Sequence, residues 1–315
     1  MIARSQADRV GQDDSASGRV VPWDEGRLQG VGDDLLYAGL RIRVERAPGV
    51  PPLALPRCLG MPVPAPAGVR ALAQVDLSMH RDPGLPRWRP APRVRAERRP
   101  GGDVGIDAGW ARCNLAPAGD GFRARADVAV DTLGGAEMDL LQLLAAVVLA
   151  ERGGALLHAA AVELDGAVCA FLGPSDAGKS TACRHTGERQ FAIDRLAVWP
   201  GGGRWWAAPV PGGPEDESPL APSAHAILPL RCLLRVFHGR GAVRAAVVPR
   251  ARALAYLRPA LQWPFGGAAG EVRALDVCEA VSQGVPVGEI HTVLGRQNAP
   301  SVRALAPVPG GEGTS

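Results

Sequence analysis

The sequence predicts a mixed α/β fold in which a small β-rich domain precedes a larger α/β domain. In the first part of the chain, apolar and polar residues alternate over several short stretches, which is typical of half-buried strands. In the second part, short apolar runs and helical patterns surround a glycine-rich loop. A chain of 315 residues is long enough to bury two ordinary cores. We therefore expect a β-rich domain over residues 35–135 and an α/β domain with a mixed sheet over residues 136–298.

The β-rich domain is predicted from three alternating stretches. Residues 35–45 alternate apolar residues such as Leu40 with polar ones, and we expect a single strand there. Residues 69–79 and 122–130 predict two more strands by the same alternation. Residues 81–100 are rich in proline and arginine, and they predict an irregular loop.

The α/β domain is predicted to begin with a helix over residues 137–151, whose acidic first turn suits the positive end of the helix dipole. Strands over residues 155–164 and 167–172 follow, joined by Asp165-Gly166, a dipeptide typical of tight hairpins. A glycine-rich loop comes next. The remaining elements expected are a helix to about residue 186, a strand over 191–199, a loop over 200–224, strands over 227–236 and 242–248, and helices over 250–261 and 276–283.

The two ends of the chain are predicted to lack fixed structure. Residues 1–34 are rich in polar residues and glycine and predict a flexible segment, and residues 299–315 predict a disordered tail. The first 19 residues show no apolar stretch of the kind found in secretory signals. The longest apolar run, residues 140–150, is about half the length needed to cross a bilayer. We therefore expect no membrane partner.

Composition excludes several classes of function. The formal net charge of +3 is too small to argue for a nucleic-acid partner. The arginine-rich residues 87–99 are an alternative contact for an acidic partner or RNA, but the high arginine content of the whole chain favours a solvated loop. The six cysteines form no C-x-x-C pair, which argues against a zinc knuckle or a redox dithiol. We expect them to be reduced in a cytoplasmic protein.

One motif carries chemistry. Lys179 is the only lysine among the 35 lysine and arginine residues, and it lies in residues 173–181, whose sequence matches G-x-x-x-x-G-K-[ST]. The glycines let the backbone wrap closely around a phosphate, so that consecutive N–H groups point at it. A lysine ammonium supplies a compact charge to the β- and γ-phosphates, and the Ser180 hydroxyl is suited to binding Mg²⁺. We predict a nucleotide phosphate site formed by Gly173, Ser175, Ala177, Gly178, Lys179, Ser180 and Thr181.

A carboxylate follows at a suitable distance along the chain. Asp194 interrupts an apolar stretch that comes after the predicted helix. An aspartate beside a phosphate-binding loop is suited to binding Mg²⁺ or to accepting the proton of a hydroxyl, and an ordinary strand-end residue is the alternative. The hairpin before the loop also makes the strand that enters it antiparallel to its predecessor, whereas the common P-loop fold has a mainly parallel sheet there.

These features resemble a known family. Residues 157–162 (Leu-His-Ala-Ala-Ala-Val), the hairpin, residues 171–181 and Ile193-Asp194 are similar to the catalytic domain of HPr serine kinase/phosphorylase. They are more similar to the HPr-kinase-related proteins that accompany peptide-modification gene clusters. The specific resemblance spans about residues 153–198, and a weaker one covers most of residues 35–297. It implies a PEP-carboxykinase-like nucleotide fold and ATP-dependent phosphorylation of a serine hydroxyl on a protein or peptide.

The resemblance also implies roles for individual residues. Lys179 would hold the phosphates, Ser180 would help bind Mg²⁺, and Asp194 would act in metal binding or as the base. His158 would lie on the strand beside the site, although a buried histidine bonded to a backbone carbonyl is an equal alternative. Hexamers occur in the resembled family, which leaves a homo-oligomer open, but no feature of this sequence predicts one.

The sequence departs from the family at two positions. Asp176 stands where the family usually has glycine, and Arg195 replaces the second of two adjacent acidic residues. Both changes leave an alternative open, in which the protein binds ATP as a scaffold or regulator without transferring phosphate. A carboxykinase-like enzyme for a small molecule is a third and weaker reading, because the sequence shows no clustered histidine and lysine ligands for a metal.

Overall fold

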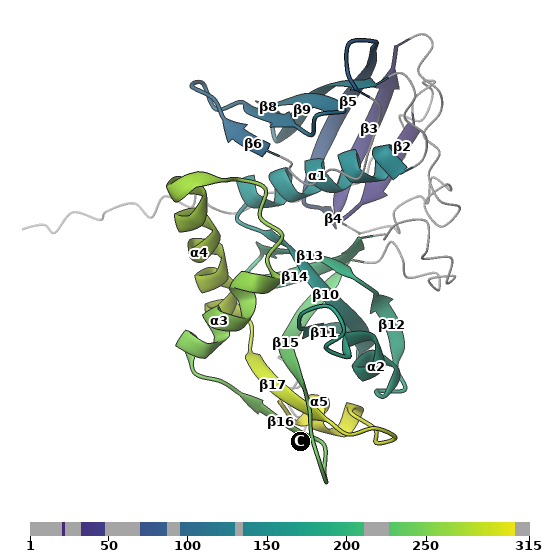
Figure 1. Cartoon of the computed structure of the whole chain (residues 1–315), viewed down its shortest axis with the longest axis vertical. Coiled ribbons are helices and arrows are strands. Elements are labelled where there is room, and N and C mark those ends of the chain that lie inside the picture. The colour runs from purple at the N-terminus through teal and green to yellow at the C-terminus, as the bar shows by residue number, and fades with distance from the viewer. Residues whose placement is uncertain are drawn as a thin grey trace, which may run out of the picture.

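We describe the protein from a computed structural model, which covers residues 21–22, 33–47, 70–86, 95–129, 135–210 and 227–305 (Figure 1). Most of the predicted flexible segment over residues 1–34 and parts of the predicted loops over 81–100 and 200–224 lie outside these residues. The described part contains helices together with strands that form large mixed sheets, which confirms the α/β class.

The N-terminal part is built on a seven-stranded sheet with the order β2-β3-β5-β9-β8-β7-β6. Strands β3, β5 and β9 are parallel to one another, and the other neighbours are antiparallel. The strands are β2 Asp33–Tyr37, β3 Leu40–Arg46, β5 Ala73–Asp82, β6 Arg95–Arg98, β7 Val104–Asp107, β8 Ala111–Ala118 and β9 Gly121–Ala129. Outside this sheet, β1 Val21–Pro22 pairs with β4 Arg70–Ala71. Alternate side chains of β5 and β9 are buried, as their sequence patterns predict.

Two predictions for this region need correction, and two strands were missed. Residues 35–45 form the hairpin β2–β3 rather than one strand, because Ala38 and Gly39 adopt positive φ angles of 54° and 78° and reverse the chain. Alternation continues through such a turn, so it does not reveal the reversal. Strand β6 lies in the region predicted to be an irregular loop, and β7 and β8 were not predicted at all.

The C-terminal part is built on an eight-stranded mixed sheet. The central strand, β10 Ala155–Leu164, pairs antiparallel with β11 Ala167–Leu172, β12 Arg189–Ala192 and β13 Arg195–Gly201. Strand β11 is parallel to β15, which is parallel to β17. The remaining bounds are β14 Arg204–Val210, β15 Leu228–His238, β16 Arg244–Val247 and β17 Val287–Thr292. The predicted hairpin at Asp165-Gly166 is confirmed with its predicted bounds, and both turn residues have positive φ.

Helices cover both faces of this sheet. On one face, Leu157 belongs to the same core as Leu257 of α3 (Arg250–Ala260) and Val277 of α4 (Gly267–Gly284). On the other face, Ala160 shares a core with Ala182 of the short helix α2 (Lys179–Arg184). Helix α5 (Ala299–Leu305) packs on this second face as well. The two faces of β10 are therefore both buried, and its sequence is accordingly almost entirely apolar.

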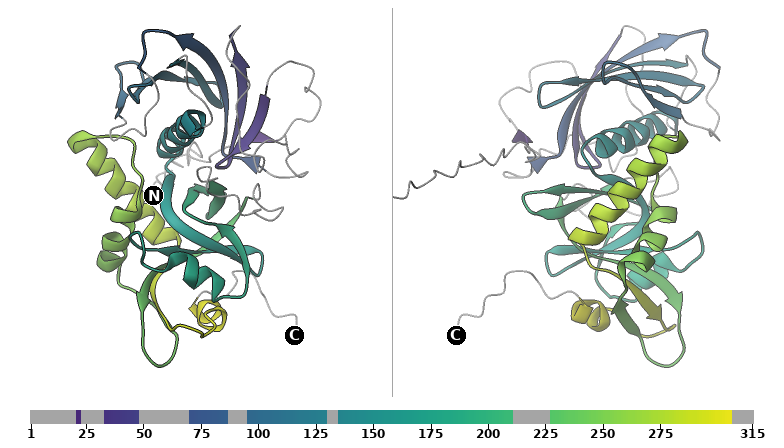
Figure 2. Two further views of the ribbon diagram at one scale, coloured as in Figure 1. Left: turned by 45° about the vertical axis from the view of Figure 1, so that its right-hand side comes forward. Right: turned by 90° about the vertical axis from the view of Figure 1, so that its left-hand side faces the viewer.

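Helix α1 (Gly135–Glu151) lies between the two sheets (Figure 2). Its Leu140 and Leu144 belong to one core with the side chains of the N-terminal sheet. The same core includes Leu156 of β10 and Trp199 of β13. The two sheets therefore pack against the same helix. The predicted helix over residues 137–151 is confirmed, and it begins two residues earlier than predicted.

Several predictions for the second half are wrong in extent. The predicted strand over 191–199 is two strands, because the chain bends at Ile193-Asp194. Strand β14 occupies part of the predicted loop over 200–224, and β17 was not predicted. Helix α4 is longer than the predicted helix over 276–283. The prediction missed its first turns because they are rich in glycine and alanine and show little apolar periodicity. Helix α5 occupies the first residues of the predicted disordered tail over 299–315.

A search of the described helices finds none with the length and apolarity that a bilayer crossing requires.

The turn of the β2–β3 hairpin touches the C-terminal sheet at one tight contact, which can be tested. A Cβ atom on Gly39 would lie 2.3 Å from the ring of the buried Trp199, and Gly39 has a φ of +78°. We expect Gly39→Ala to lower the free energy of unfolding by about 2–4 kcal/mol, combining the backbone cost with overpacking. Thermal or denaturant unfolding measures the loss.

Gly202→Ala is the matched control, because Gly202 also has a positive φ of 60° but a Cβ there would meet no atom within 4 Å. It should cost only the backbone part, about 1 kcal/mol. Equal losses in the two variants would contradict the importance of the Gly39–Trp199 contact.

Candidate functional site

The predicted phosphate-binding loop connects β11 to α2 on the face of the sheet that carries α2. A Cβ on Gly173 would lie 2.6 Å from the Cβ of Ala177, so only glycine allows the loop to close this tightly. Gly178 has a φ of +84° immediately before the helix begins at Lys179. The two glycines of the motif are therefore required by the shape of the backbone, as the sequence motif predicts.

Lys179 points back into this loop. Its Nζ donates to the carbonyl oxygens of Gly173 and Pro174 at 3.0 and 2.9 Å, and it lies 2.7 Å from Nε2 of His158. The residue is 8% exposed. Desolvation by burial lowers the pKa of its ammonium, and the nearby Asp194 carboxylate opposes this shift. A buried ammonium with three acceptors is held in one position, ready to exchange carbonyl oxygens for the oxygens of an anion.

His158 joins this lysine to the predicted carboxylate. Its Nδ1 lies 3.0 Å from Oδ1 of Asp194, while its Nε2 faces Lys179. Because an ammonium can only donate, we assign Nε2 as the acceptor and Nδ1 as the donor to Asp194, the pattern of a neutral imidazole. Burial, together with the charge of Lys179, lowers the pKa of His158 below its usual value, which keeps the ring neutral at pH 7.

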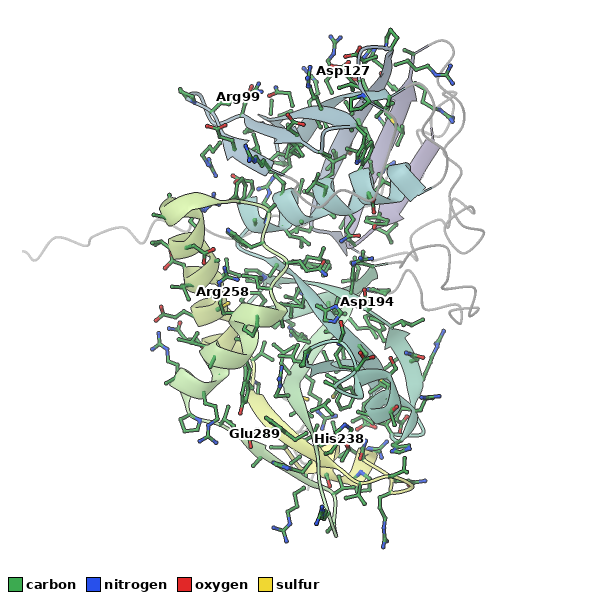
Figure 3. The ribbon with its side chains drawn as sticks, viewed as in Figure 1. Arg99, Asp127, Asp194, His238, Arg258 and Glu289 are labelled. Carbon is green, nitrogen blue, oxygen red and sulfur yellow. The ribbon has the colours of Figure 1, made fainter. Side chains whose placement is uncertain are left out.

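Asp194 is positioned by the break between β12 and β13. Its backbone carbonyl accepts from the N–H of Ala159 at 3.0 Å, which fixes it beside β10. Its Oδ2 lies 3.7 Å from Nε of Arg195, and Arg195 pairs with His158 across β10 and β13. The structure thus brings the three predicted catalytic residues together in one connected group, Lys179–His158–Asp194 (Figure 3 labels Asp194).

The remaining predicted residues surround this group. Ser175 and Ser180 are exposed, and Thr181 is half-buried and accepts a hydrogen bond from Arg184 at 3.2 Å. Within the described residues there is no cluster of three or more histidine, cysteine, aspartate or glutamate side chains that could hold a metal. The oxygens of Ser180 and Asp194 nevertheless suit Mg²⁺, which is commonly held by one or two protein oxygens together with substrate phosphates.

Sequence reasoning missed two residues of the site, Arg235 and His238. Both lie at the carboxyl end of β15, which runs parallel to β11, and Arg235 pairs with Leu172, the last residue before the loop. A Cβ on Gly178 would lie 3.2 Å from Cε1 of His238. The parallel pairing brings these two side chains to the loop from more than 50 residues away, so no local pattern could have revealed them.

Asp176, the first departure from the family pattern, lies in this loop with a φ of +63°. This left-handed conformation favours glycine and is tolerated by aspartate. The side chain is exposed, but its charge still acts on Lys179 and raises the lysine pKa. The carboxylate therefore adds negative charge near the place where phosphates are expected.

Compared with models of known protein families and with curated proteins, the chain matches none. The assignment of this site therefore depends on its own geometry.

The His158 contacts predict a pH-dependent stability. The pKa of His158 is lower in the folded protein than in the unfolded chain, where it is about 6.5. Between the two pKa values the unfolded chain binds more protons, so the free energy of unfolding falls as the pH drops through this window. We expect the melting temperature to fall from pH 7.5 to pH 5.5, and to fall less in His158→Gln. Thermal unfolding at several pH values measures both slopes.

His80→Gln is the control, because His80 lies on β5 of the N-terminal sheet, away from the Lys179–His158–Asp194 group. It should keep the wild-type pH dependence. An unchanged slope in His158→Gln would show that the Lys179–His158–Asp194 contacts do not control the protonation of His158.

Proposed function

We propose that this protein is a cytoplasmic, Mg²⁺- and ATP-dependent kinase that phosphorylates a serine hydroxyl on a protein or peptide. One observation carries the proposal: a lysine in a phosphate-binding motif and a candidate base are joined through a single histidine, at 2.7 and 3.0 Å. Phosphoryl transfer needs mainly positioning and charge neutralisation, and this arrangement supplies both within one connected group. The five described cysteines are buried and free, which agrees with a reducing compartment.

Lys179 binds the triphosphate in this mechanism. When phosphate oxygens arrive, they replace the carbonyls of Gly173 and Pro174 as acceptors for Nζ, while His158 keeps the ammonium in position. Arg235 adds a second positive charge from the end of β15. Ser180 and Asp194 would hold Mg²⁺, which neutralises charge on the phosphates when it is bound.

Asp194 acts as the base. A serine hydroxyl attacks the γ-phosphorus, its proton passes to the Asp194 carboxylate, and a new Oγ–P bond forms. The bond between the γ-phosphorus and the bridging oxygen breaks at the same time, and ADP leaves with that oxygen. The Nδ1–H of His158 donates to Oδ1 and orients the carboxylate, so that Oδ2 is left for the serine proton.

A second function has a specific observation in its favour. Arg195 lies 3.7 Å from Oδ2 of Asp194, the same oxygen that the serine proton would need. If this contact persisted with substrate bound, the protein would bind ATP without transferring phosphate and would act as a scaffold or regulator. The contact is longer than a hydrogen bond, so Arg195 does not lock the carboxylate and the kinase remains the proposal that we favour.

Two substitutions separate binding from transfer. We expect Lys179→Ala to weaken ATP binding roughly 100-fold or more, because it removes one partner of a buried, charge-assisted contact. We expect Asp194→Asn to leave ATP affinity within a few-fold and to lower transfer by roughly 10²–10⁴, the usual contribution of a general base. Calorimetry measures ATP binding, and labelled ATP with cell lysate or serine peptides measures transfer.

Glu271→Gln is the control for charge removal, since Glu271 is exposed on α4 and pairs with Arg258 away from the loop. It should change neither quantity. Retained ATP affinity in Lys179→Ala would reject the phosphate site, whereas ATP binding without label on any serine would favour the scaffold.

A substitution of Asp176 is expected to strengthen ATP binding, whereas Lys179→Ala weakens it. Removing its charge should tighten ATP binding, because the carboxylate repels the phosphates across solvent. We expect Asp176→Asn to lower the dissociation constant roughly two- to fivefold, in line with about 0.4–1 kcal/mol for an exposed charge interaction. Asp176→Gly should do the same and should also raise the melting temperature, because its φ of +63° suits glycine. Weaker ATP binding in both variants would show that Asp176 contributes to the site instead of opposing it.

A further inference from the structure

A cavity of about 630 Å³ lies between the two sheets, next to the candidate site. Helix α1 supplies Gln142 and Ala146 on one side, and the β7–β8 turn supplies Trp110. The C-terminal part supplies Leu156, Arg195 and Trp263. This volume and this mixture of aromatic, aliphatic and a few polar side chains are typical of ligand-binding cavities.

The polar groups around the cavity indicate what it can accept. The indole nitrogens of Trp110 and Trp263 are fully covered, so these two residues offer the cavity only apolar ring surface. Gln142 donates to Gln262, which leaves the outer atoms of this amide pair for a further partner. Arg195 and Asp139 contribute opposite charges, so the lining favours an uncharged occupant. Apolar walls beside an amide pair with a free donor and a free acceptor suit an apolar side chain flanked by backbone amides, as in a peptide segment.

The cavity and the candidate site share one face of the sheet. Leu156, which lines the cavity, and His158, which contacts Lys179, are two residues apart on β10, so their side chains point to the same side about 7 Å apart. Arg195 lines the cavity and is also the residue 3.7 Å from Asp194. A substrate polypeptide that presents a serine hydroxyl to Asp194 can therefore place in the cavity a side chain two or three residues from that serine.

We propose that this cavity receives a large apolar side chain of the acceptor polypeptide, two or three residues from the serine that is phosphorylated. The proposal rests on the proposed kinase function and adds a specificity site to it. Backbone groups beside that side chain bond the outer atoms of the Gln142–Gln262 amide pair, and the same segment passes Arg195 on its way to Asp194. Gln142 and Ala146 of α1 line the opposite wall, so the N-terminal half of the protein takes part in substrate selection.

Fluorescent blocked nonapeptides with a central serine test this proposal. Leucine or glycine is placed two or three residues before or after the serine, and all other positions are alanine or polar. Fluorescence anisotropy with the full chain and ATP measures peptide binding, and labelled ATP measures transfer. We expect at least one leucine position to improve binding fivefold or more over the matching glycine peptide.

Cavity variants then locate the effect. Ala146→Phe should fill the cavity and remove the leucine preference, whereas Leu143→Ala should enlarge it and shift the preference toward phenylalanine or tryptophan. Leu275→Ala, an exposed change on α4, should leave the preference unchanged. ATP affinity and thermal unfolding confirm that each variant is folded, and Leu143→Ala answers the question if Ala146→Phe does not fold.

The outcomes distinguish the two proposals. Equal binding of leucine and glycine peptides by a protein that binds ATP would overturn the cavity proposal and leave the kinase proposal standing. A leucine preference that survives both cavity variants would also overturn it. Loss of ATP binding or of all transfer concerns the kinase proposal, because the peptide-binding measurement does not require transfer.

Discussion

The pairing of β10 with three strands is the constraint on which the rest of this structure depends. The tight Asp165-Gly166 turn fixes its register with β11, and the bend at Asp194 lets both β12 and β13 pair along its other edge. Because side chains alternate along a strand, this register directs His158 to the face that carries α1 and α2. A slip of one residue would turn His158 into the opposite core and separate Lys179 from Asp194.

Local signals explain which parts of the fold could be predicted. The β10–β11 hairpin, helix α1 and strand β9 were predictable because their turn chemistry and apolar patterns are strong within a short window. The β2–β3 reversal was not, because alanine rarely takes the positive φ that Ala38 has here. Strands β7, β8 and β17 were missed since short strands gain most of their stability from partners that a local pattern does not reveal.

The same distinction applies to the site. Lys179 was predictable because a loop that wraps phosphate needs glycines and an ammonium at fixed spacing, and the chain has one lysine. Asp194 was predictable from its place after the helix, whereas the role of His158 followed from a resemblance. The link from Lys179 to Asp194 through the His158 imidazole emerges only from strand pairing. The parallel pairing of β11 with β15 places Arg235 and His238 beside the loop. The packing of α1 against the C-terminal sheet makes Arg195 part of the cavity lining as well.

Helix α1 has a practical consequence for handling this protein. Its buried leucines belong to a core that contains residues of both sheets, from Leu40 and Leu115 in the first to Leu156 and Trp199 in the second. A recombinant fragment that starts after the helix would expose Trp199 to water, and one that ends before it would expose the apolar face of the first sheet. Either fragment is an aggregation hazard, so a recombinant protein should span both halves.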